Sequence, residues 1–214
     1  MYLPDHFAEQ RSDILQQLIH DYPLATLITQ EADGLCANHI PFIFSPPDDQ
    51  YPHGVLYGHV ARANPVWQNR QEALLVFQGA SSYITPAWYP EKRQTGAVVP
   101  TYNYAVVHAR GTMRTIEEPQ QLLALLTRLT DRFEGGRADR WQVSDAPDEY
   151  LHNLMAMIVG IEIPLTSLTG KWKTSQNRSV EARSDISAGL RKQSDDASQH
   201  MAAIIEAQLF DQNG

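Results

Sequence analysis

Residues 82–89 read SYITPAWY, and residues 98–104 read VVPTYNY. These two strand-like segments bring aromatic rings and hydrogen-bonding groups close together in the chain. Buried Tyr and Trp side chains are favourable only where each hydroxyl and indole N–H finds a partner. So dense a group of them predicts either a wall of the core or a surface that accommodates a flat polar ring.

Short β-branched and aromatic runs surround these segments and are separated by Gly, Pro, Asn and Asp. This pattern is typical of an antiparallel barrel, for which we expect about six strands. The expected strands are residues 24–29, 36–44, 54–59, 74–78, 97–114 and 159–164.

Other stretches have helical spacing of their apolar residues. We expect helices at residues 7–20, 119–133 and 148–157, and a pair of helices beyond Ser179 that is divided near residues 189–194. Ser194 is the expected N-cap of the last helix. The pair has the outline of a helix-turn-helix, but its acidic and apolar side chains suit packing against a partner better than contact with DNA.

Length and composition indicate one main soluble domain. The chain has 214 residues, of which 43% are hydrophobic and 20% charged. No run of about 18 apolar residues is present, so we expect no membrane span. The N-terminus does not have the pattern of a secretory signal, and we therefore expect a cytoplasmic protein.

Charge and cysteine usage narrow the function classes further. Cys36 is the single cysteine, and the eight histidines show no ligand spacing, so we expect neither a disulfide nor a metal site. The net charge is −8 and the pI is near 5.4. Such a chain does not grip nucleic acid with its whole surface, and any contact with DNA would be local.

The segment VLYGHVARANP, residues 55–65, predicts a strand that enters a tight turn or the start of a helix. Arg62 and free backbone N–H groups would meet at this turn and hold an anion such as a phosphate. Taken alone, an ordinary surface arginine is the more common explanation.

Asn38 and His39 lie on the strand expected at residues 36–44. Pro41 cannot donate to a ladder of hydrogen bonds and therefore marks this strand as an edge or a bulge, where polar side chains can reach a ligand. A histidine held by backbone partners is an equally good explanation, since a lone His is weakly diagnostic.

Strand alternation over residues 100–110 places Thr101 and Asn103 on one face, with small residues after them, and Tyr102 and Tyr104 on the other. The first face leaves room for a ring, and the Tyr face would pack against the core or a second subunit. In the structural alternative, Asn103 is a turn or bulge residue.

Residues 170–178 read GKWKTSQNR, a strongly basic segment that contains no acid. Lys171, Lys173 and Arg178 form a second candidate anion site. The same pattern of basic residues beside an aromatic ring also suits a nucleic-acid backbone, and a solvated loop is a third explanation.

Four motifs follow one another in the order MYLPDHF (1–7), HVARANP (59–65), the segments at 82–104, and GKWKTSQNR (170–178). In these motifs the chain resembles the PaiB family, FMN-binding proteins described as negative transcriptional regulators. The resemblance implies an antiparallel split β-barrel with flanking helices over residues 1–178 and a helical appendage at 179–214. It also implies a symmetric homodimer with FMN at or near the subunit interface.

The resemblance strengthens the candidate sites. The turn at Arg62 would hold the flavin phosphate, although Asn64 stands where related split barrels often carry a basic residue. Thr101 and Asn103 would meet the pyrimidine edge, while Lys171 or Arg178 would stabilise the reduced ring. The residues expected to contact FMN are Asn38, His39, His59, Arg62, Asn64, Thr101, Asn103, Lys171, Gln176, Asn177 and Arg178.

Three functions follow as hypotheses. The first is a PaiB-type regulator in which FMN occupancy or redox state alters an interaction with a partner or with DNA. The second is an FMN-dependent oxidoreductase acting on a small molecule, with Arg62, Lys171 and Arg178 holding the flavin. The third is a haem-handling protein that uses His59 or His108 as axial ligand. No Ser-His-Asp or Cys-His grouping has credible spacing, so we do not expect a hydrolase.

Overall fold

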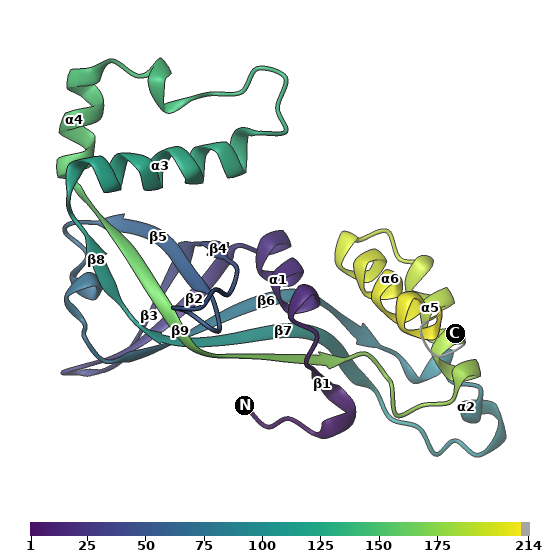
Figure 1. Cartoon of the computed structure of the whole chain (residues 1–214). Coiled ribbons are helices and arrows are strands. Elements are labelled where there is room, and N and C mark those ends of the chain that lie inside the picture. Colours follow the sequence, from purple (N-terminus) through teal and green to yellow (C-terminus); the bar gives the residue numbers. More distant parts are fainter. Residues whose placement is uncertain (211–214) are drawn as a thin grey trace. The chain divides into compact units, whose positions relative to one another are not determined.

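The computed structural model describes residues 1–210, and within them nine strands form one sheet with helices on its flanks (Figure 1). The order is β3-β2-β6-β7-β9-β5-β4, and β1 and β8 also pair with β9. The strands are β1 (Ala8–Glu9), β2 (Leu24–Glu31), β3 (Gly34–Pro41), β4 (Ile43–Ser45), β5 (Val55–Ala61), β6 (Glu72–Ile84), β7 (Thr101–Thr112), β8 (Arg114–Ile116) and β9 (Ile158–Lys173).

The helices agree with the expected positions, with shifted ends. The α-helices are α1 (Ser12–Asp21), α2 (Glu91–Gln94), α3 (Pro119–Glu134), α4 (Asp148–Ala156), α5 (Val180–Arg191) and α6 (Asp196–Phe210). Short 3-10 turns are η1 (Asp5–Phe7), η2 (Pro65–Gln68), η3 (Pro86–Trp88) and η4 (Val143–Asp145). The opening helix starts at Ser12 instead of Phe7, because Ala8 and Glu9 pair with Lys171 and Gly170 of β9.

Three local expectations were wrong. The sheet has nine strands and not about six, because Pro41 ends β3 before β4 begins and because residues 8–9 and 114–116 add short strands. Residues 97–100 precede β7 and are not strand. Asp195, and not Ser194, caps α6: its Oδ1 atom accepts a hydrogen bond of 2.8 Å from the backbone N–H of Ser198.

The position of β3 at the end of the strand order confirms that Pro41 lies on an edge strand. Proline has no backbone N–H, but on an edge strand this leaves the hydrogen bonds between the central strands intact. Strand β2 pairs with β3 in antiparallel register from Leu24↔Pro41 to Glu31↔Gly34. Gly34 has a φ of 129°, a backbone angle that favours glycine where the chain turns between these strands.

The described chain divides into two compact units, and strands β6, β7 and β9 contribute residues to both. Unit 1 contains Met1–Leu15, Gln78–Val107 and the described residues from Thr169 onward. Unit 2 contains Gln16–Phe77 and His108–Leu168. Unit 1 therefore joins the final helices to the segments at residues 82–104. The expected boundary at residues 178 and 179 stays a prediction, and its last four residues, 211–214, lie outside the described part.

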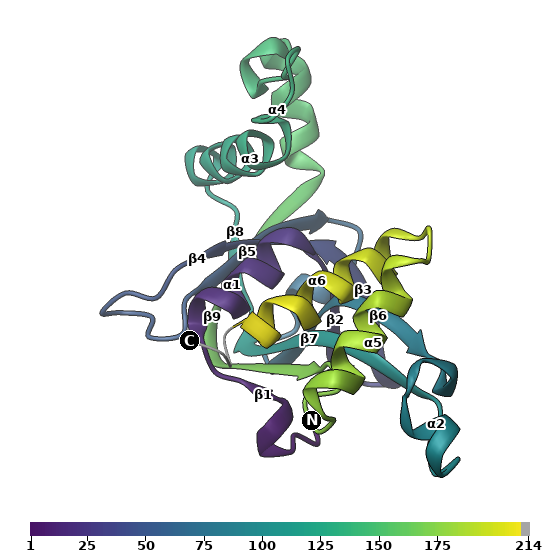
Figure 2. The same cartoon turned by 90° about the vertical axis from the view of Figure 1, so that its right-hand side faces the viewer.

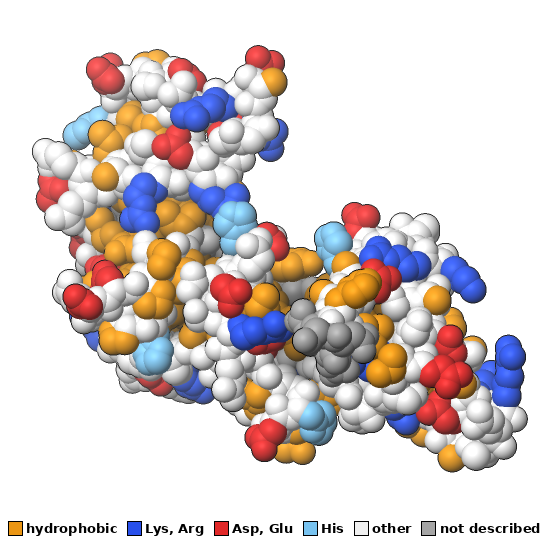
Figure 3. All heavy atoms as spheres, turned by 45° about the vertical axis from the view of Figure 1, so that its right-hand side comes forward, with side chains coloured by type: hydrophobic (Ala, Val, Ile, Leu, Met, Phe, Trp, Pro, Cys, Tyr) orange, Lys and Arg blue, Asp and Glu red, His pale blue; other side chains and the backbone are white. Residues whose placement is uncertain are grey.

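In unit 2, the apolar stripe of α3 packs as expected from its helical spacing. Leu122, Leu125 and Leu129 are buried and contact half-buried side chains that include Tyr57 and Met155. Figure 3 shows further hydrophobic side chains gathered beneath α3 and α4.

In unit 1, α5 and α6 lie side by side (Figure 2) and share one apolar core with the end of β6. Ser82 and Ser198 hydrogen-bond to each other at 2.9 Å within it, so two buried hydroxyls satisfy one another. The core residues are Ala80, Ile84, Tyr89, Ala182, Ile186, Leu190, Met201, Ala202 and Ile205.

Beyond Thr101, the face of β7 that carries the small residues is buried, and whether this face receives a ring stays a prediction. Asn103, Ala105 and Val107 are at most 1% exposed, whereas Tyr102 is 59% exposed. Small side chains on β7 let other elements approach closely, so this face is covered and the neighbouring tyrosine is turned outward.

Over residues 1–210, the structure has no helix that combines the length and the apolar composition needed to cross a bilayer.

Candidate functional site

A pocket of about 230 Å³ lies in unit 1 beside the start of β7 and the end of β9, and we call it the β7–β9 pocket. It brings together segments that are far apart in the sequence, including the N-terminal turn and the residues that follow β9. Its lining consists of Phe7, Tyr89, Val99, Pro100, Thr101, Asn103, Lys173, Ser175, Asn177 and Arg178.

A buried polar pair forms the inner wall of this pocket. The Nδ2 atom of Asn103 donates to Ser175 Oγ at 2.9 Å, and Ser175 Oγ donates to Asn103 Oδ1 at 3.2 Å. Asn103 is 0% exposed, so these bonds replace the water that its amide loses on burial. Ser175 has a φ of 66°, a left-handed angle that costs energy for a residue other than glycine.

Neighbouring side chains hold Ser175 in this unusual conformation. Gln176 Oε1 accepts a hydrogen bond of 2.8 Å from the backbone N–H of Thr174, and its Nε2 atom donates to the carbonyl of Trp172. Thr174 Oγ1 donates to Oε1 of Gln208 in α6 at 2.6 Å. The turn after β9 is therefore fixed from its own chain and from the last helix.

Two cationic side chains line the pocket. The ammonium of Lys173 donates to Thr101 Oγ1 and to the carbonyl of Tyr102. Burial, and then the nearby charge of Lys171, lower the pKa of Lys173. The guanidinium of Arg178 lies over the Tyr89 ring at 5.0 Å from its centroid.

Lys171 and Gln176 do not line the pocket. Lys171 is 7% exposed and donates to the carbonyl of Tyr2 at 3.0 Å. Its Nζ atom also lies 5.6 Å from the Tyr2 ring and 5.5 Å from the Tyr104 ring. The N-terminal segment thus covers Lys171, while Gln176 supports the turn through backbone contacts.

In unit 2, the side chain of Arg62 holds neighbouring backbone in place. Its Nε and Nη2 atoms donate to the carbonyls of Ala156 and Ile158, each at 3.0 Å. Nη1 makes an ion pair with Glu117 at 2.9 Å. Three nitrogen atoms of the guanidinium therefore have protein partners.

Asn38 and Asn64 meet next to this turn. Asn64 Nδ2 donates to Asn38 Oδ1 at 2.7 Å, while Asn64 Oδ1 accepts from the backbone N–H of Val66 at 3.0 Å and caps η2. Asn64 thus caps η2 in the turn that contains Arg62.

Three histidines of unit 2, His39, His59 and His108, lie on strands. His39 Nδ1 and Thr26 Oγ1 are 3.2 Å apart across the β2–β3 pair. His59 pairs with Gly160 across β5 and β9, and burial lowers its pKa. His108, the other residue considered for haem, also has a pKa lowered chiefly by burial.

The structure thus collects Thr101, Asn103, Asn177 and Arg178 at one pocket of unit 1, and Asn38 and Asn64 at the Arg62 turn of unit 2. That the two groups converge around one flavin stays a prediction.

Comparison with protein families matches residues 1–167 to the family described as "Putative FMN-binding domain". The chain belongs to this FMN-binding domain family. The resemblance to PaiB proteins is confirmed, and so is FMN as the cofactor.

The alignments with two curated relatives cover nearly the whole chain. "Uncharacterized protein AN0679" of Emericella nidulans is 35% identical in an alignment that covers 96% of each chain. "Protease synthase and sporulation protein PAI 2" of Bacillus subtilis is 27% identical over 212 residues, which cover 98% of each chain.

Among solved structures, the FAD and heme binding protein from Mycobacterium smegmatis superposes with a TM-score of 0.58 at 18% identity. The match covers 85% of this chain and 80% of that one. A likeness at this identity shows the fold, and the predicted split-barrel fold class is confirmed.

The residues of the β7–β9 pocket fit FMN, which has a polar pyrimidine edge, an apolar ring edge and an anionic phosphate. Thr101, Asn103 and Asn177 offer hydroxyl and amide groups, and Lys173 and Arg178 offer positive charge. Pockets for small molecules measure about 300–1,000 Å³. At about 230 Å³, this pocket suits part of an FMN molecule better than all of it.

Sequence reasoning did not select several pocket residues, although a signal for each was present. Tyr89, Val99 and Pro100 lie in the aromatic segments at residues 82–89 and 98–104, and Phe7 lies in the N-terminal motif. Ser175 lies in GKWKTSQNR, as does Lys173, which was expected in the second anion site but not among the residues that contact FMN. Their part in the site depends on contacts with residues of β7, which local spacing does not reveal.

Proposed function

We propose that this protein is an FMN-binding regulator of the PaiB type, and that part of its flavin occupies the β7–β9 pocket. The observation that carries the proposal is the buried Asn103–Ser175 pair, which sits beside the cations Lys173 and Arg178. A polar wall next to positive charge matches a ligand that has hydrogen-bonding edges and a negative charge. When bound, FMN supplies reversible redox chemistry, so its occupancy or oxidation state would be the regulated variable.

Each pocket residue has a proposed task. The amides of Asn103 and Asn177 and the hydroxyl of Thr101 hold the polar edge of the flavin. Lys173 and Arg178 pair with its negative charge. Burial strengthens this attraction, because water screens the charges less. The aromatic side chains of the lining, Phe7 and Tyr89, exclude water from the ring.

The small pocket volume supports a homodimer in which a second copy covers the rest of the flavin. Val99, Tyr102 and Tyr83 belong to the same unit and are 65%, 59% and 50% exposed. Such side chains suit an isologous contact, in which one surface serves both subunits. Sedimentation equilibrium with and without FMN tests this arrangement, and a monomer at every concentration in both samples would refute it.

The basic segment is poorly suited to contact DNA. Lys171 is covered by the N-terminal segment, and Lys173 and Arg178 line the β7–β9 pocket that we assign to the flavin. On the face that Figure 3 shows, basic and acidic side chains alternate around α5 and α6 without a continuous basic surface. We therefore propose that regulation acts through a protein partner, or through a DNA contact away from this segment.

Flavin titration of purified protein tests the FMN site. Arg178→Gln should weaken FMN binding by about 10- to 100-fold, since a hydrogen bond to a charged group contributes about 1.5–3 kcal/mol. The matched control is Arg140→Gln, because Arg140 makes an exposed ion pair with Asp131 in unit 2 and does not line the β7–β9 pocket. Equal FMN affinity in the two variants would remove Arg178 from the site.

Two further measurements separate the functions. Flavin absorption bands in the protein as purified are expected, whereas a Soret band would support the haem hypothesis. Gel shifts against genomic fragments at several salt concentrations test direct DNA binding. The oxidoreductase would be favoured instead if the FMN-loaded protein reduced a small molecule catalytically and FMN changed its binding to no protein partner or promoter.

A further inference from the structure

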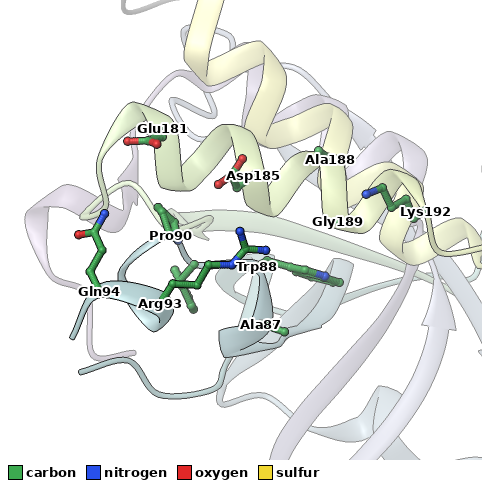
Figure 4. A pocket seen from close by; sticks show the side chains of 11 residues that line it. Ala87, Trp88, Pro90, Arg93, Gln94, Glu181, Asp185, Ala188, Gly189 and Lys192 are labelled. Carbon is green, nitrogen blue, oxygen red and sulfur yellow. The ribbon is translucent and has the colours of Figure 1, made fainter. Parts of the chain in front are cut away.

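A second and larger cavity of unit 1 lies between α5 and the segment that includes η3 and α2 (Figure 4). We call it the α2–α5 cavity. Its volume of about 550 Å³ is within the range of small-molecule sites. It is distinct from the β7–β9 pocket, although one side chain, Tyr89, lines both.

An indole ring forms one wall of this cavity and is seated firmly. A Cβ atom added at Gly189 of α5 would lie 2.4 Å from Cδ2 and 2.5 Å from Cε2 of Trp88. The ring therefore rests directly on the backbone of α5, a close approach that requires glycine. Trp88 is half-buried, which leaves part of its surface to the cavity.

Charged groups of both signs face the same space. Helix α5 places Glu181 and Asp185, together with its C-cap residue Lys192, along one side, at spacings of four and seven residues that keep them on one face. Arg93 reaches in from α2, opposite Asp185, as Figure 4 shows.

These charges do not neutralise each other. Within residues 1–210, the side chains of Arg93, Lys192, Glu181 and Asp185 make no ion pair within 4.0 Å and no hydrogen bond. An anionic ligand would meet two carboxylates here, and a cationic ligand would meet two cations. A molecule that carries both charges meets a complement for each.

We propose that the α2–α5 cavity binds a zwitterionic small molecule with a flat apolar group, of the class of the aromatic amino acids. Its carboxylate pairs with Arg93 or Lys192, its ammonium pairs with Asp185 or Glu181, and its ring packs on the indole of Trp88. Charge-assisted hydrogen bonds and an aromatic contact are the interactions that the cavity offers to such a ligand.

Tyr89 gives this site a route to the flavin. It follows Trp88 in the chain, is 2% exposed, and carries the Arg178 guanidinium over its ring. A ligand that shifts Trp88 or Tyr89 would change the affinity for FMN, and FMN would change the affinity for that ligand by the same factor. This coupling rests on the proposed function, whereas binding in the α2–α5 cavity does not.

Calorimetric titration with L-tryptophan and L-phenylalanine tests the binding. Tryptamine lacks the carboxylate, and indole-3-propionate lacks the ammonium. L-Tryptophan should bind at least about tenfold more tightly than either analogue, since each lost charge removes a charge-assisted hydrogen bond. Equal binding of the three compounds, or no heat with either amino acid, would overturn the proposal.

Two variants locate the charges. Arg93→Gln should lower the affinity for L-tryptophan and leave the affinity for tryptamine unchanged. Asp185→Asn should lower the affinity for L-tryptophan and leave the affinity for indole-3-propionate unchanged. The matched controls are Lys92→Gln, next to Arg93 but outside the cavity lining, and the exposed Asp139→Asn of unit 2. Far-ultraviolet circular dichroism confirms folding of each variant. Losses no larger than those of the controls would place the ligand elsewhere.

The coupling has its own readout. FMN titration with and without saturating L-phenylalanine should give two different dissociation constants in the native protein and a single one in Arg93→Gln. An unchanged FMN dissociation constant in native protein that binds L-phenylalanine would refute the coupling and leave the binding site standing. Absence of FMN binding in both samples would instead count against the proposed function.

Discussion

Asn103 and Ser175 are 72 residues apart in the chain and exchange two hydrogen bonds inside unit 1. The pair joins β7 to the turn after β9 at the wall of the β7–β9 pocket. Each group is buried and depends on the other, because an unpaired buried amide or hydroxyl costs about 1–3 kcal/mol. The same contact therefore shapes the pocket and stabilises the folded protein.

Removal of this contact should destabilise the protein. We expect Asn103→Ala to lower the free energy of unfolding by about 1–3 kcal/mol, because Ser175 loses its partner. The double variant with Ser175→Ala should cost less than the sum of the single variants. Urea unfolding of the three proteins measures this, and strict additivity would show that the pair is not coupled.

Arg62 should matter for stability more than for flavin binding. We expect Arg62→Gln to lower the free energy of unfolding by about 1–3 kcal/mol, because the carbonyls of Ala156 and Ile158 lose their donor. Glu117→Gln removes only an exposed ion pair and should cost under about 1 kcal/mol. Flavin titration of folded Arg62→Gln is the deciding measurement: a large loss of affinity would support the phosphate-binding hypothesis.

His59 should make stability fall in mild acid. Burial lowers its pKa, so the folded state resists a proton that the unfolded chain accepts below about pH 6.5. The protein is therefore most stable, with respect to this group, above that pH, and loses stability as the pH drops towards the folded pKa. His59→Gln should flatten the urea-midpoint profile between about pH 5 and 7. His53→Gln, in an exposed loop, is the control and should leave the profile unchanged.

A methyl group at Gly189 should displace Trp88. Alanine is the better helix former by about 1 kcal/mol, but its Cβ would lie 2.4 Å from the indole. Overpacking of this kind costs about 1–3 kcal/mol, so we expect Gly189→Ala to be destabilising on balance. Ser184→Ala, at an exposed position of the same helix, should be neutral or stabilising.

Tryptophan fluorescence of Gly189→Ala provides a second readout. Its emission should shift to the red as the indole of Trp88 enters water, and Trp88→Phe serves as the reference for the remaining tryptophans. A thermally stabilised variant with unchanged emission would contradict the close contact.

The spacing of apolar residues along the chain correctly predicted helices and strands that have one apolar face. The Leu stripe of α3, the helix pair after Ser179 and the edge position marked by Pro41 all follow from spacing or backbone chemistry. Element ends were less predictable. The strand that includes Val159–Pro164 continues to Lys173, and its residues Gly170 and Lys171 pair with β1.

Site residues were predictable as types but not as partners. The motif GKWKTSQNR correctly indicated a cationic segment, yet Lys171 is covered, Lys173 lines the pocket and Gln176 supports the turn. Alternation alone gives Lys171 and Lys173 the same face. The difference between them comes from the N-terminal segment, which lies 169 residues away from Lys171 in the chain.

The sequence by itself determined the periodicity of the strands and helices, the FMN-binding domain family, and the segments rich in aromatic and basic residues. Only the tertiary structure decided which polar side chains are consumed by internal partners, as Arg62 is, and which line a cavity, as Arg178 does. The physical reason is the distance along the chain between interacting residues. Spacing along the chain reports which face a residue occupies, whereas its burial and its hydrogen-bond partner depend on segments that approach only after folding.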